Sequence, residues 1–383
     1  MDLNAYLQDL EFLVNIDSGP DAPEGQTRIA EFFQNRFAAL GWQTDLYPLP
    51  GHDAPCLVCR NRQAGHRNRQ AGHYDVLLIG HIDTVFPKGT AAQRPFRRDE
   101  ARAYGPGVLD MKQGALMMYY VLRDLPAPVC QKLNILAVFN PDEEIGSPHS
   151  QPLTDSLAAQ TDYVLVYEGA SADGALCARR KGRLTMTMDF TGKPCHCGYV
   201  FQNDGRSAIS EMARWIVALD ALQDQARGTS VNVGVVSGGT NLNTVAEHAS
   251  MQVDVRFLQN SESRRMDDTL AALLQQAERR GIQVQIHSRK LTPALEPTPQ
   301  AERFLNRVRQ VATSLGQEFT ERLRGGVSDA NHLARQGSVC LDALGPGGDD
   351  DHTAQEYLNL DSIVPAWRLS QGILQDLATD KTT

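Results

Sequence analysis

The hydrophobic pattern changes part-way along the chain, and this change constrains the fold more than any other feature. From Val76 onward, apolar strands alternate with amphipathic helices. This alternation predicts βαβ units and a largely parallel sheet. In order, the predicted elements are strand 76–79, helix 111–122, strand 133–139, helix 153–159 and strand 163–167. From Leu184 to Phe190, apolar residues instead occupy every second position, which is typical of a half-buried strand.

The second pattern predicts a separate domain inserted into the first. Its elements follow the βαββαβ order of a ferredoxin-like α+β unit: strand 184–190, helix 206–222, strand 231–236, strand 251–257, helix 266–280 and strand 282–287. α/β alternation then returns, with a helix from Ala301, a strand at 339–344 and a helix after Asp361. The predicted fold is therefore α/β, a mixed, largely parallel sheet flanked by helices. The predicted boundaries are a discontinuous catalytic domain at 1–182 and 293–383, and an insert at 183–292.

The N-terminal part carries two amphipathic helices, two short strands and a tandem duplication. The heptapeptide RNRQAGH occupies residues 60–66 and again 67–73. It is polar and contains glycine, so we expect it to lengthen a surface loop, which costs little closure entropy. We do not expect His66 or His73 to be metal ligands.

Composition excludes several classes of function. The 383 residues carry a net charge of −9 without a long basic run, so no nucleic-acid partner is expected. No apolar run is long enough to span a bilayer, and the acidic N-terminal segment lacks the features of a signal peptide. Seven scattered cysteines favour reduced thiols in a cytoplasmic protein, and Cys56 and Cys59 are expected in the core.

An apolar run, Leu136 to Phe139, leads into three consecutive carboxylates at Asp142, Glu143 and Glu144. Adjacent acids raise one another's pKa unless water or a cation screens them. A solvated turn after a strand would account for them, and we assign Asp142 no role beyond the turn. Neighbouring side chains point in different directions, so Glu143 and Glu144 are expected to play different parts. Spacing alone does not say which of the two would bind a metal.

Four distant residues share the position that those acids occupy, directly after a strand or in a glycine-rich loop. They are His81, Asp110, Glu168 and His352. Taken singly, each suits an ordinary turn or strand end. Ligands of open α/β sheets bind outside the carboxyl ends of the strands, so these residues can meet Glu144 in one crevice. Two imidazoles and three carboxylates suit one or two zinc ions.

Asp83 stands two residues beyond His81 and can project to the same side of the strand. A carboxylate there can accept the free N–H of a ligating imidazole. Such a contact fixes the tautomer of the ring. We therefore expect Asp83 to support His81.

Short motifs in a fixed order carry a family resemblance over nearly the whole chain. They are HIDTVFPKG, AYGPGVLDMKQG, FNPDEEIGS, VYEGAS, TGKPCHCG, GGTNLNTV, DVRF and GGVSDAN. The chain resembles the dinuclear zinc metallopeptidases that include carboxypeptidase G (glutamate carboxypeptidase), acetylornithine deacetylase, succinyl-diaminopimelate desuccinylase and aminoacylase. The segments around His81 and Asp110 are most similar to the carboxypeptidase G branch.

The resemblance implies roles for particular residues. It implies two Zn²⁺ per subunit, with Co²⁺ or Mn²⁺ as possible substitutes, and Glu143 as the general base. Asp110 is the implied bridging ligand. The full implied ligand set is His81, Asp110, Glu144, Glu168 and His352.

The resemblance also implies a task for the inserted domain, as a lid and as the contact of a homodimer. His196 would reach an active site across the dimer and polarise the scissile carbonyl, while Asn243 and Arg256 would hold the carboxylate of the substrate. Two alternatives for His196 are a metal-binding cluster with Cys195 and Cys197, or a plain surface strand. After His196 the chain has Cys197 where the family has alanine, and the following loop differs.

These implications predict a hydrolase that cleaves an amide, in a peptide or an N-acyl amino acid, next to a free carboxylate. The partner is then a small molecule, with neither nucleic acid nor membrane involved. One alternative is an N-acyl amino-acid deacylase of the acetylornithine or succinyl-diaminopimelate type. A second is a catalytically silent ligand-binding protein of the same fold.

Overall fold

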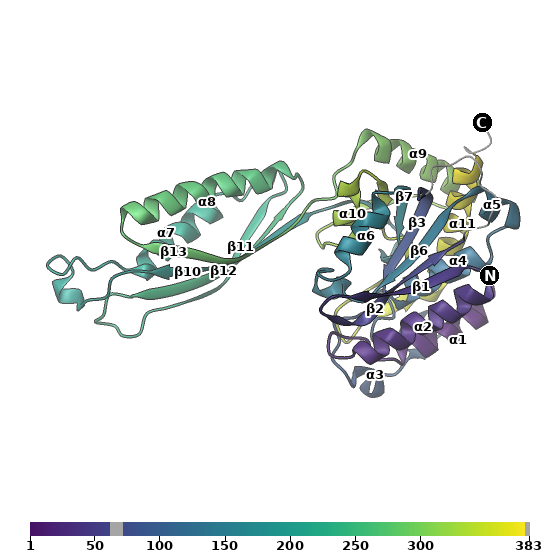
Figure 1. Cartoon of the computed structure of the whole chain (residues 1–383), viewed down its shortest axis with the longest axis horizontal. Coiled ribbons are helices and arrows are strands. Elements are labelled where there is room, and N and C mark those ends of the chain that lie inside the picture. Colours follow the sequence, from purple (N-terminus) through teal and green to yellow (C-terminus); the bar gives the residue numbers. More distant parts are fainter. Residues whose placement is uncertain (62–71, 380–383) are drawn as a thin grey trace. The chain divides into compact units, whose positions relative to one another are not determined.

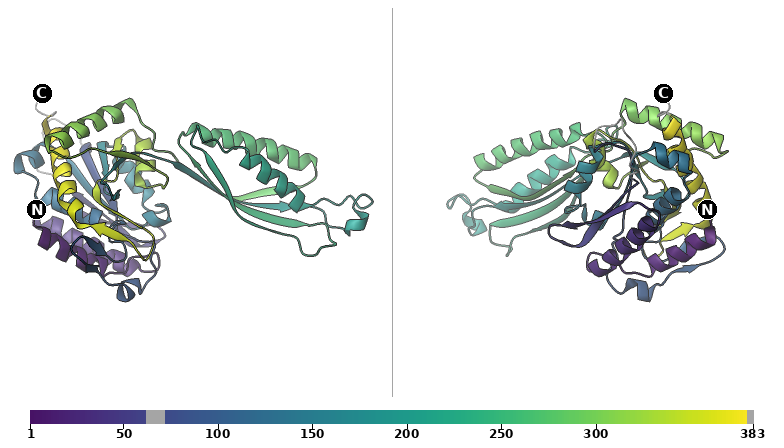
Figure 2. Two further views of the ribbon diagram at one scale, coloured as in Figure 1. Left: turned by 180° about the vertical axis from the view of Figure 1, so that it is seen from behind. Right: turned by 45° about the vertical axis from the view of Figure 1, so that its right-hand side comes forward.

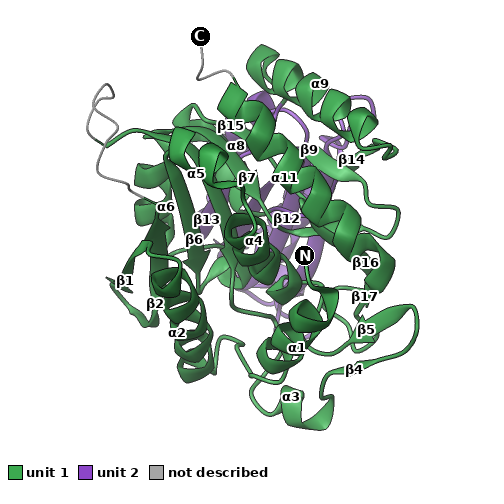
Figure 3. Cartoon of the chain, turned by 90° about the vertical axis from the view of Figure 1, so that its right-hand side faces the viewer, with its two compact units in different colours: residues 1–178, 297–323, 328–383 green, residues 179–296, 324–327 purple. Residues whose placement is uncertain are grey.

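A computed structural model describes residues 1–61 and 72–379. Most of the duplicated RNRQAGH segment, and with it the predicted surface loop and His66, lies outside the described residues. The chain divides into two compact units (Figure 3). Unit 1 is Met1–Ala178, Pro297–Leu323 and Ser328–Thr383, and unit 2 is Arg179–Glu296 and Arg324–Val327. The short segment 324–327 joins unit 2 although its sequence pattern does not indicate this.

Unit 1 is built on a mixed sheet with strand order β1-β2-β6-β3-β7-β15 (Figure 1). The strands are β1 (Gln43–Leu49), β2 (His52–Arg60), β3 (Tyr74–His81), β6 (Ile135–Asn140), β7 (Thr161–Val166) and β15 (Val339–Leu341). β6, β3, β7 and β15 run parallel, whereas β1 and β2 pair antiparallel. Every residue of β3 is buried, as expected for a strand covered on both faces. The predicted fold class is confirmed.

Helices and sheet of unit 1 share one hydrophobic core. The helices are α1 (Leu3–Val14), α2 (Pro23–Ala39), α3 (Thr90–Gln93), α4 (Lys112–Arg123), α5 (Ala127–Lys132), α6 (Gln151–Ala158), α9 (Pro299–Ser314), α10 (Asp329–Leu333) and α11 (Ile363–Thr379). Alternate strand residues such as Val76, Leu78 and Phe139 join this core. Cys56 and Cys59 on β2 are fully buried, as predicted. Within the described ranges, no helix is both long and apolar enough to cross a membrane.

A second sheet of unit 1 was not predicted, because its strands are short and one of them, β16, consists mainly of glycine. Its order is β4-β5-β17-β16-β8. The strands are β4 (Arg97–Arg98), β5 (Arg102–Tyr104), β8 (Gly169–Ser171), β16 (Gly345–Asp349) and β17 (Tyr357–Asn359). A Cβ on Gly348 would lie 2.0 Å from the carbonyl oxygen of Tyr357, so only glycine allows this close approach. Part of the predicted glycine-rich loop before His352 is therefore a strand.

Unit 2 is an antiparallel sheet of order β11-β12-β10-β13 with helices α7 and α8 on one face (Figure 2). Its elements are β10 (Gly182–Thr191), α7 (Ala208–Asp220), β11 (Ser230–Gly238), β12 (His248–Phe257), α8 (Ser261–Arg279) and β13 (Gln283–Thr292). The chain enters unit 2 along β9 (Leu176–Arg180) and leaves it after β13, at Glu296. β9 pairs with β14 (Glu321–Arg324), which follows α9. The element order is that of the ferredoxin-like unit expected from the sequence.

Candidate metal centre

The five predicted ligands come from the strand ends and loops at one edge of the unit 1 sheet. His81 is the last residue of β3, and Glu168 lies two residues after the end of β7. Glu144 lies in a short 3₁₀ helix, η1 (Glu143–Ile145), that begins three residues after β6. Asp110 precedes α4, and His352 follows β16. The carboxyl ends of parallel strands thus converge as the sequence argument requires.

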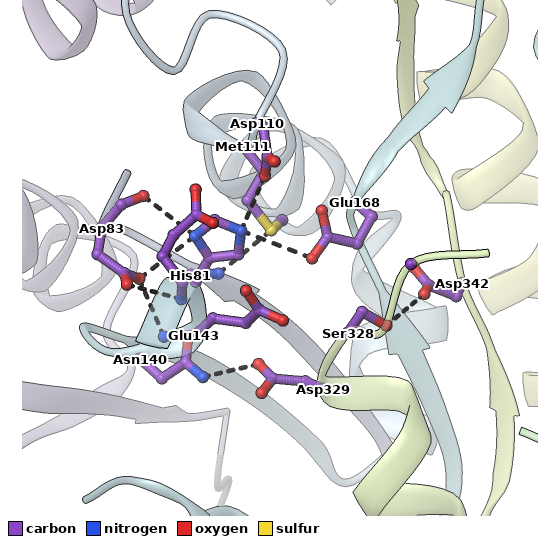
Figure 4. Close-up of polar contacts among 12 residues, drawn as sticks. His81, Asp83, Asp110, Met111, Asn140, Glu143, Glu168, Ser328, Asp329 and Asp342 are labelled. Carbon is purple, nitrogen blue, oxygen red and sulfur yellow. Dashed lines mark hydrogen bonds and ion pairs between the residues drawn. The ribbon is translucent and has the colours of Figure 1, made fainter. Parts of the chain in front are cut away.

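Asp110 lies between the two imidazoles. Its Oδ1 is 3.0 Å from Nε2 of His81, and its Oδ2 is 3.0 Å from Nε2 of His352. Glu168 Oε1 lies 3.5 Å from the same nitrogen of His81 (Figure 4). Glu144 Oε2 lies 3.2 Å from Nε2 of His352. Two ligand pairs therefore form around one aspartate that offers an oxygen to each.

The residues present fit a divalent metal. Glu144 Oε1 is buried and has no hydrogen-bond partner among the described residues, so it is an acceptor left for a cation. Ligand atoms of His81, Asp110 and Glu144 all lie within 4.8 Å of one another. A second such group contains His81, Glu143 and Glu168, so proximity alone does not separate Glu143 from the ligands.

The charges at the centre are balanced by protons when no cation is bound. Although burial disfavours its charge, hydrogen bonds from His352 and His81 hold the pKa of Asp110 well below its usual value. Contacts with Asp110 and Glu144 raise the pKa of His352 to about 11. Burial raises the pKa of Glu144 to about 7 and that of Glu143 well above its usual value. A divalent cation would displace these protons, because ligating groups must be deprotonated.

Asp83 supports the centre in two ways. Its backbone carbonyl oxygen lies 3.1 Å from Nδ1 of His81, and its Oδ1 lies 3.3 Å from the same atom. A carbonyl oxygen only accepts, so Nδ1 keeps its proton, and Nε2 is the nitrogen that gives up its proton when a metal binds. The Asp83 carboxylate also accepts the backbone N–H groups of Glu143 and Glu144, at 3.2 and 2.9 Å. This second contact was not predicted.

Asp142, for which the sequence suggested no role, folds the segment that follows it. The side chain is 1% exposed, and its Oδ2 accepts the backbone N–H groups of His149 and Ser150 at 2.7 and 3.2 Å. The three consecutive acids therefore do not form a solvated turn. Asp142 closes the loop, whereas Glu143 and Glu144 face the candidate centre.

Asp329 is a further buried carboxylate that sequence reasoning missed. It accepts hydrogen bonds from Asn140 at 2.7 Å and from the Ser147 hydroxyl at 2.8 Å. Figure 4 shows Glu143 between His81 and Asp329. Its position in the GGVSDAN motif was the available signal, but that motif alone did not indicate which groups it would bind.

The predicted residues of unit 2 fall into two places. His196 and Asn243 lie close together, because the Cys197 N–H donates to the Asn243 carbonyl and His196 bridges to Thr244. Asn243 precedes β12, whereas Arg256 lies near the far end of that strand, roughly 26 Å from its first residue, His248, at about 3.3 Å per residue. The predicted substrate-binding pair of Asn243 and Arg256 is therefore not brought together within one chain.

The side chains of His196 and Arg256, at the two ends of unit 2, both have hydrogen-bond partners. His196 Nδ1 accepts the Gly198 N–H at 3.1 Å, which leaves Nε2 as the donor of the neutral ring. Arg256 donates to Asp254 at 2.7 Å, and Arg183 donates to the same carboxylate at 2.8 Å. Two guanidinium groups on one carboxylate leave a net positive charge.

The alternative metal cluster around His196 has no support. Among the described residues, Cys195, His196 and Cys197 do not form a group of ligand atoms within 4.8 Å of one another. Cys197 and His196 are both exposed. A ring with one free donor nitrogen suits hydrogen bonding to a substrate better than metal binding.

Comparison with known proteins shows the class of this chain. The profile of peptidase family M20/M25/M40 matches residues 77–376, and the chain belongs to this family. It is therefore a metallohydrolase, as the motifs predict, and its family implies a divalent metal site and a small peptide substrate. Among its relatives, carboxypeptidase G2 of Pseudomonas sp. (strain RS-16) is 28% identical over 384 residues, covering 98% of this chain and 90% of the relative.

Solved structures show the same fold. Aminopeptidase PepT from Bacillus cereus ATCC 10987 superposes with a TM-score of 0.80 at 19% identity, and 99% of each chain is covered. The M20 family metallo-carboxypeptidase Sso-CP2 from Sulfolobus solfataricus gives a TM-score of 0.68 at 16% identity, covering 99% of this chain and 100% of the other. At such identities the likeness concerns the fold.

Proposed function

We propose that the protein is a zinc-dependent hydrolase that cleaves an amide bond next to a free carboxylate and releases a C-terminal amino acid such as glutamate. The main support for the proposal is the position of Asp110, which offers one oxygen to His81 and the other to His352. Glu144 and Glu168 complete two ligand sets. The similarity to carboxypeptidase G2 over 98% of the chain supports the choice of substrate.

The metals would be held by His81, Asp110, Glu144, Glu168 and His352. When bound, divalent zinc lowers the pKa of water and polarises a carbonyl oxygen. Glu143 takes the proton of the attacking water and delivers it to the leaving amine. The Nε2–H of His196 donates to the oxygen that gains charge as the carbonyl is attacked.

The arrangement of unit 2 favours a homodimer. His196 and Asn243 lie beyond the His248 end of β12, and Arg256 lies roughly 26 Å along that strand from His248, at about 3.3 Å per residue. One copy therefore does not place all three around one substrate. Two copies related by a two-fold axis can do so if each contributes one end of its unit 2 to the site of the other.

A panel of substrates tests the function. Peptides and N-aroyl, N-acetyl and N-succinyl amino acids with a free carboxylate would be incubated with the zinc-loaded protein, and the released amine measured. We expect hydrolysis of substrates ending in glutamate, its loss after dialysis against a chelator, and its return with zinc. Preference for acetyl or succinyl groups would instead indicate a deacylase. Failure on every substrate, with metal bound, would indicate the silent binding protein.

A further inference from the structure

Glu356, a buried carboxylate outside the ligand set, joins the two loops that carry Asp110 and His352. It lies four residues after His352 and is 1% exposed. Its Oε1 accepts the backbone N–H groups of Leu109 at 2.8 Å and of Asp110 at 3.0 Å. Its Oε2 accepts the Gly107 N–H at 2.9 Å. Three N–H groups of the Asp110 loop therefore converge on one side chain.

The Asp110 loop is tightly held at this point. Gly107 has φ of 72°, and a Cβ there would lie 3.1 Å from the Asp110 carbonyl oxygen and 2.5 Å from a methyl carbon of Thr84. Buried N–H groups without an acceptor are costly, and an ionised acceptor forms stronger hydrogen bonds than a neutral one. Lys112 fixes the other side of the loop, since its Nζ donates to the Ile16 carbonyl at 2.7 Å.

The position of Glu356 is itself fixed by both loops. The next residue, Tyr357, begins β17 and pairs with Tyr104 of β5. It also pairs with Asp349 of β16. β5 leads into the Asp110 loop and β16 leads into the segment of His352. Because β5 and β16 both pair with β17, Glu356 stands directly before the strand that aligns the two segments.

We infer that Glu356 is a positioning residue that sets Asp110 between the two imidazoles and thereby determines metal affinity. The inference rests on the proposed function in one respect, that Asp110 and His352 hold metal. The hydrogen bonds of Glu356 go to backbone N–H groups, so the residue acts through the loop. Loss of these hydrogen bonds displaces the Asp110 backbone, which carries the shared ligand.

Glu356→Gln is the sharpest change, because it preserves size. Its amide oxygen can replace Oε1 and accept from Leu109 and Asp110. The NH₂ group then faces the Gly107 N–H, so that two hydrogen-bond donors meet and neither has an acceptor. The reverse orientation places the NH₂ group against two N–H groups. Either orientation breaks the loop contact without creating a cavity.

The test is a titration of metal-free, full-length protein with Co²⁺, followed by visible absorption. We expect Glu356→Gln to bind Co²⁺ about 10- to 100-fold more weakly, the usual cost of losing a supporting contact of a ligand, and with a changed spectrum. Gln355→Ala, an exposed neighbour in the same segment, is the control and should match the unmodified protein. Equal affinity and spectrum for Glu356→Gln would overturn the inference.

A second variant keeps the inference testable if Glu356→Gln does not fold, which its metal-free melting curve would reveal. Glu356→Asp keeps the charge but withdraws it by one methylene group, so we expect a smaller loss of Co²⁺ affinity. Unchanged affinity in a folded Glu356→Asp protein would then overturn the inference. Absence of Co²⁺ binding by the unmodified protein would refute the proposed function instead.

Discussion

Asp83 holds the backbone of Glu144 in place: its Oδ2 accepts the Glu144 N–H at 2.9 Å. Its other oxygen accepts the Glu143 N–H and lies 3.3 Å from Nδ1 of His81. One buried carboxylate therefore fixes the backbone that carries two acidic residues and the tautomer of an imidazole. The positions of the proposed ligands His81 and Glu144 and of the proposed base Glu143 therefore depend on the same aspartate.

Asp83→Asn should weaken metal binding about 10- to 100-fold. An amide at this position keeps one acceptor oxygen, so its NH₂ group meets the N–H of Glu143 or Glu144. Competition with a chromogenic zinc chelator would measure the loss. Asp53→Asn, an exposed aspartate of the same unit, is the matched control. Zinc affinity equal to that of the unmodified protein would exclude this role for Asp83.

Glu143→Gln should retain its metal while kcat falls about 10²- to 10⁴-fold, the range typical of a lost general base. Glu144→Gln should instead lose metal, because it removes a ligand. Metal content and kcat of both variants would be measured side by side. The comparison is informative because ligand atoms of both glutamates lie within 4.8 Å of His81 in their respective groups. Loss of metal from Glu143→Gln would reverse the assignment.

Mixing two inactive variants should restore activity if sites are shared between copies. Protein with His196→Ala and protein with Arg256→Ala would be unfolded together and refolded as a mixture. Half of the dimers then contain one copy of each variant. In such a mixed dimer one of the two sites combines an intact His196 with an intact Arg256, so about a quarter of the full activity is expected. Each variant refolded alone is the control. A mixture that stays inactive despite forming dimers would contradict the shared site.

Protonated His332 should stabilise the fold below neutral pH. Although burial favours its neutral form, contacts with Asp155 and Asp329 raise its pKa from 6.5 to about 9. A group whose pKa is higher in the folded state stabilises the fold fully below its unfolded pKa, here about 6.5, and this stabilisation is lost as the pH rises to about 9. The shift corresponds to roughly 3 kcal/mol in the free energy of unfolding. Melting temperatures of His332→Gln and of the unmodified protein should therefore differ more at pH 6 than at pH 10.

The matched control for that experiment is His248→Gln, which changes an exposed histidine of unit 2. Its melting temperature should follow the unmodified protein at every pH. A gap between His332→Gln and the unmodified protein that is as large at pH 10 as at pH 6 would show that the ring acts through packing.

Periodicity was sufficient to predict elements that are long or fully buried. β3 and β6 contain apolar runs of strand length, and β10 alternates without interruption, so their type follows from the pattern and length of the apolar residues. β16 could not be predicted, because it consists of glycine, proline and aspartate and is a strand only through close contact with neighbouring backbones. Its pairing is a tertiary effect that overrides local propensity.

The proximity of the five proposed ligands, and of Asp83 to His81, could be predicted from the sequence, whereas the contacts of Glu356 and Asp142 could not. His81 and Glu168 follow strands whose ends share one sheet edge, and the motif order supplied the rest. The supports work through backbone N–H groups, which every residue possesses. No spacing rule therefore links Glu356 to Gly107, or Asp142 to His149, before the loops are folded.

Unit 2 interrupts unit 1 between β7 and β15, and this has a consequence for synthesis on the ribosome. β15 pairs with β7, yet it emerges only after the ~120 residues of the insert, which require roughly 6 to 24 s at usual elongation rates. During that interval β7 is an unprotected edge strand, a template for pairing with other chains. His352 emerges later still, so a nascent chain cannot yet assemble the full set of metal ligands.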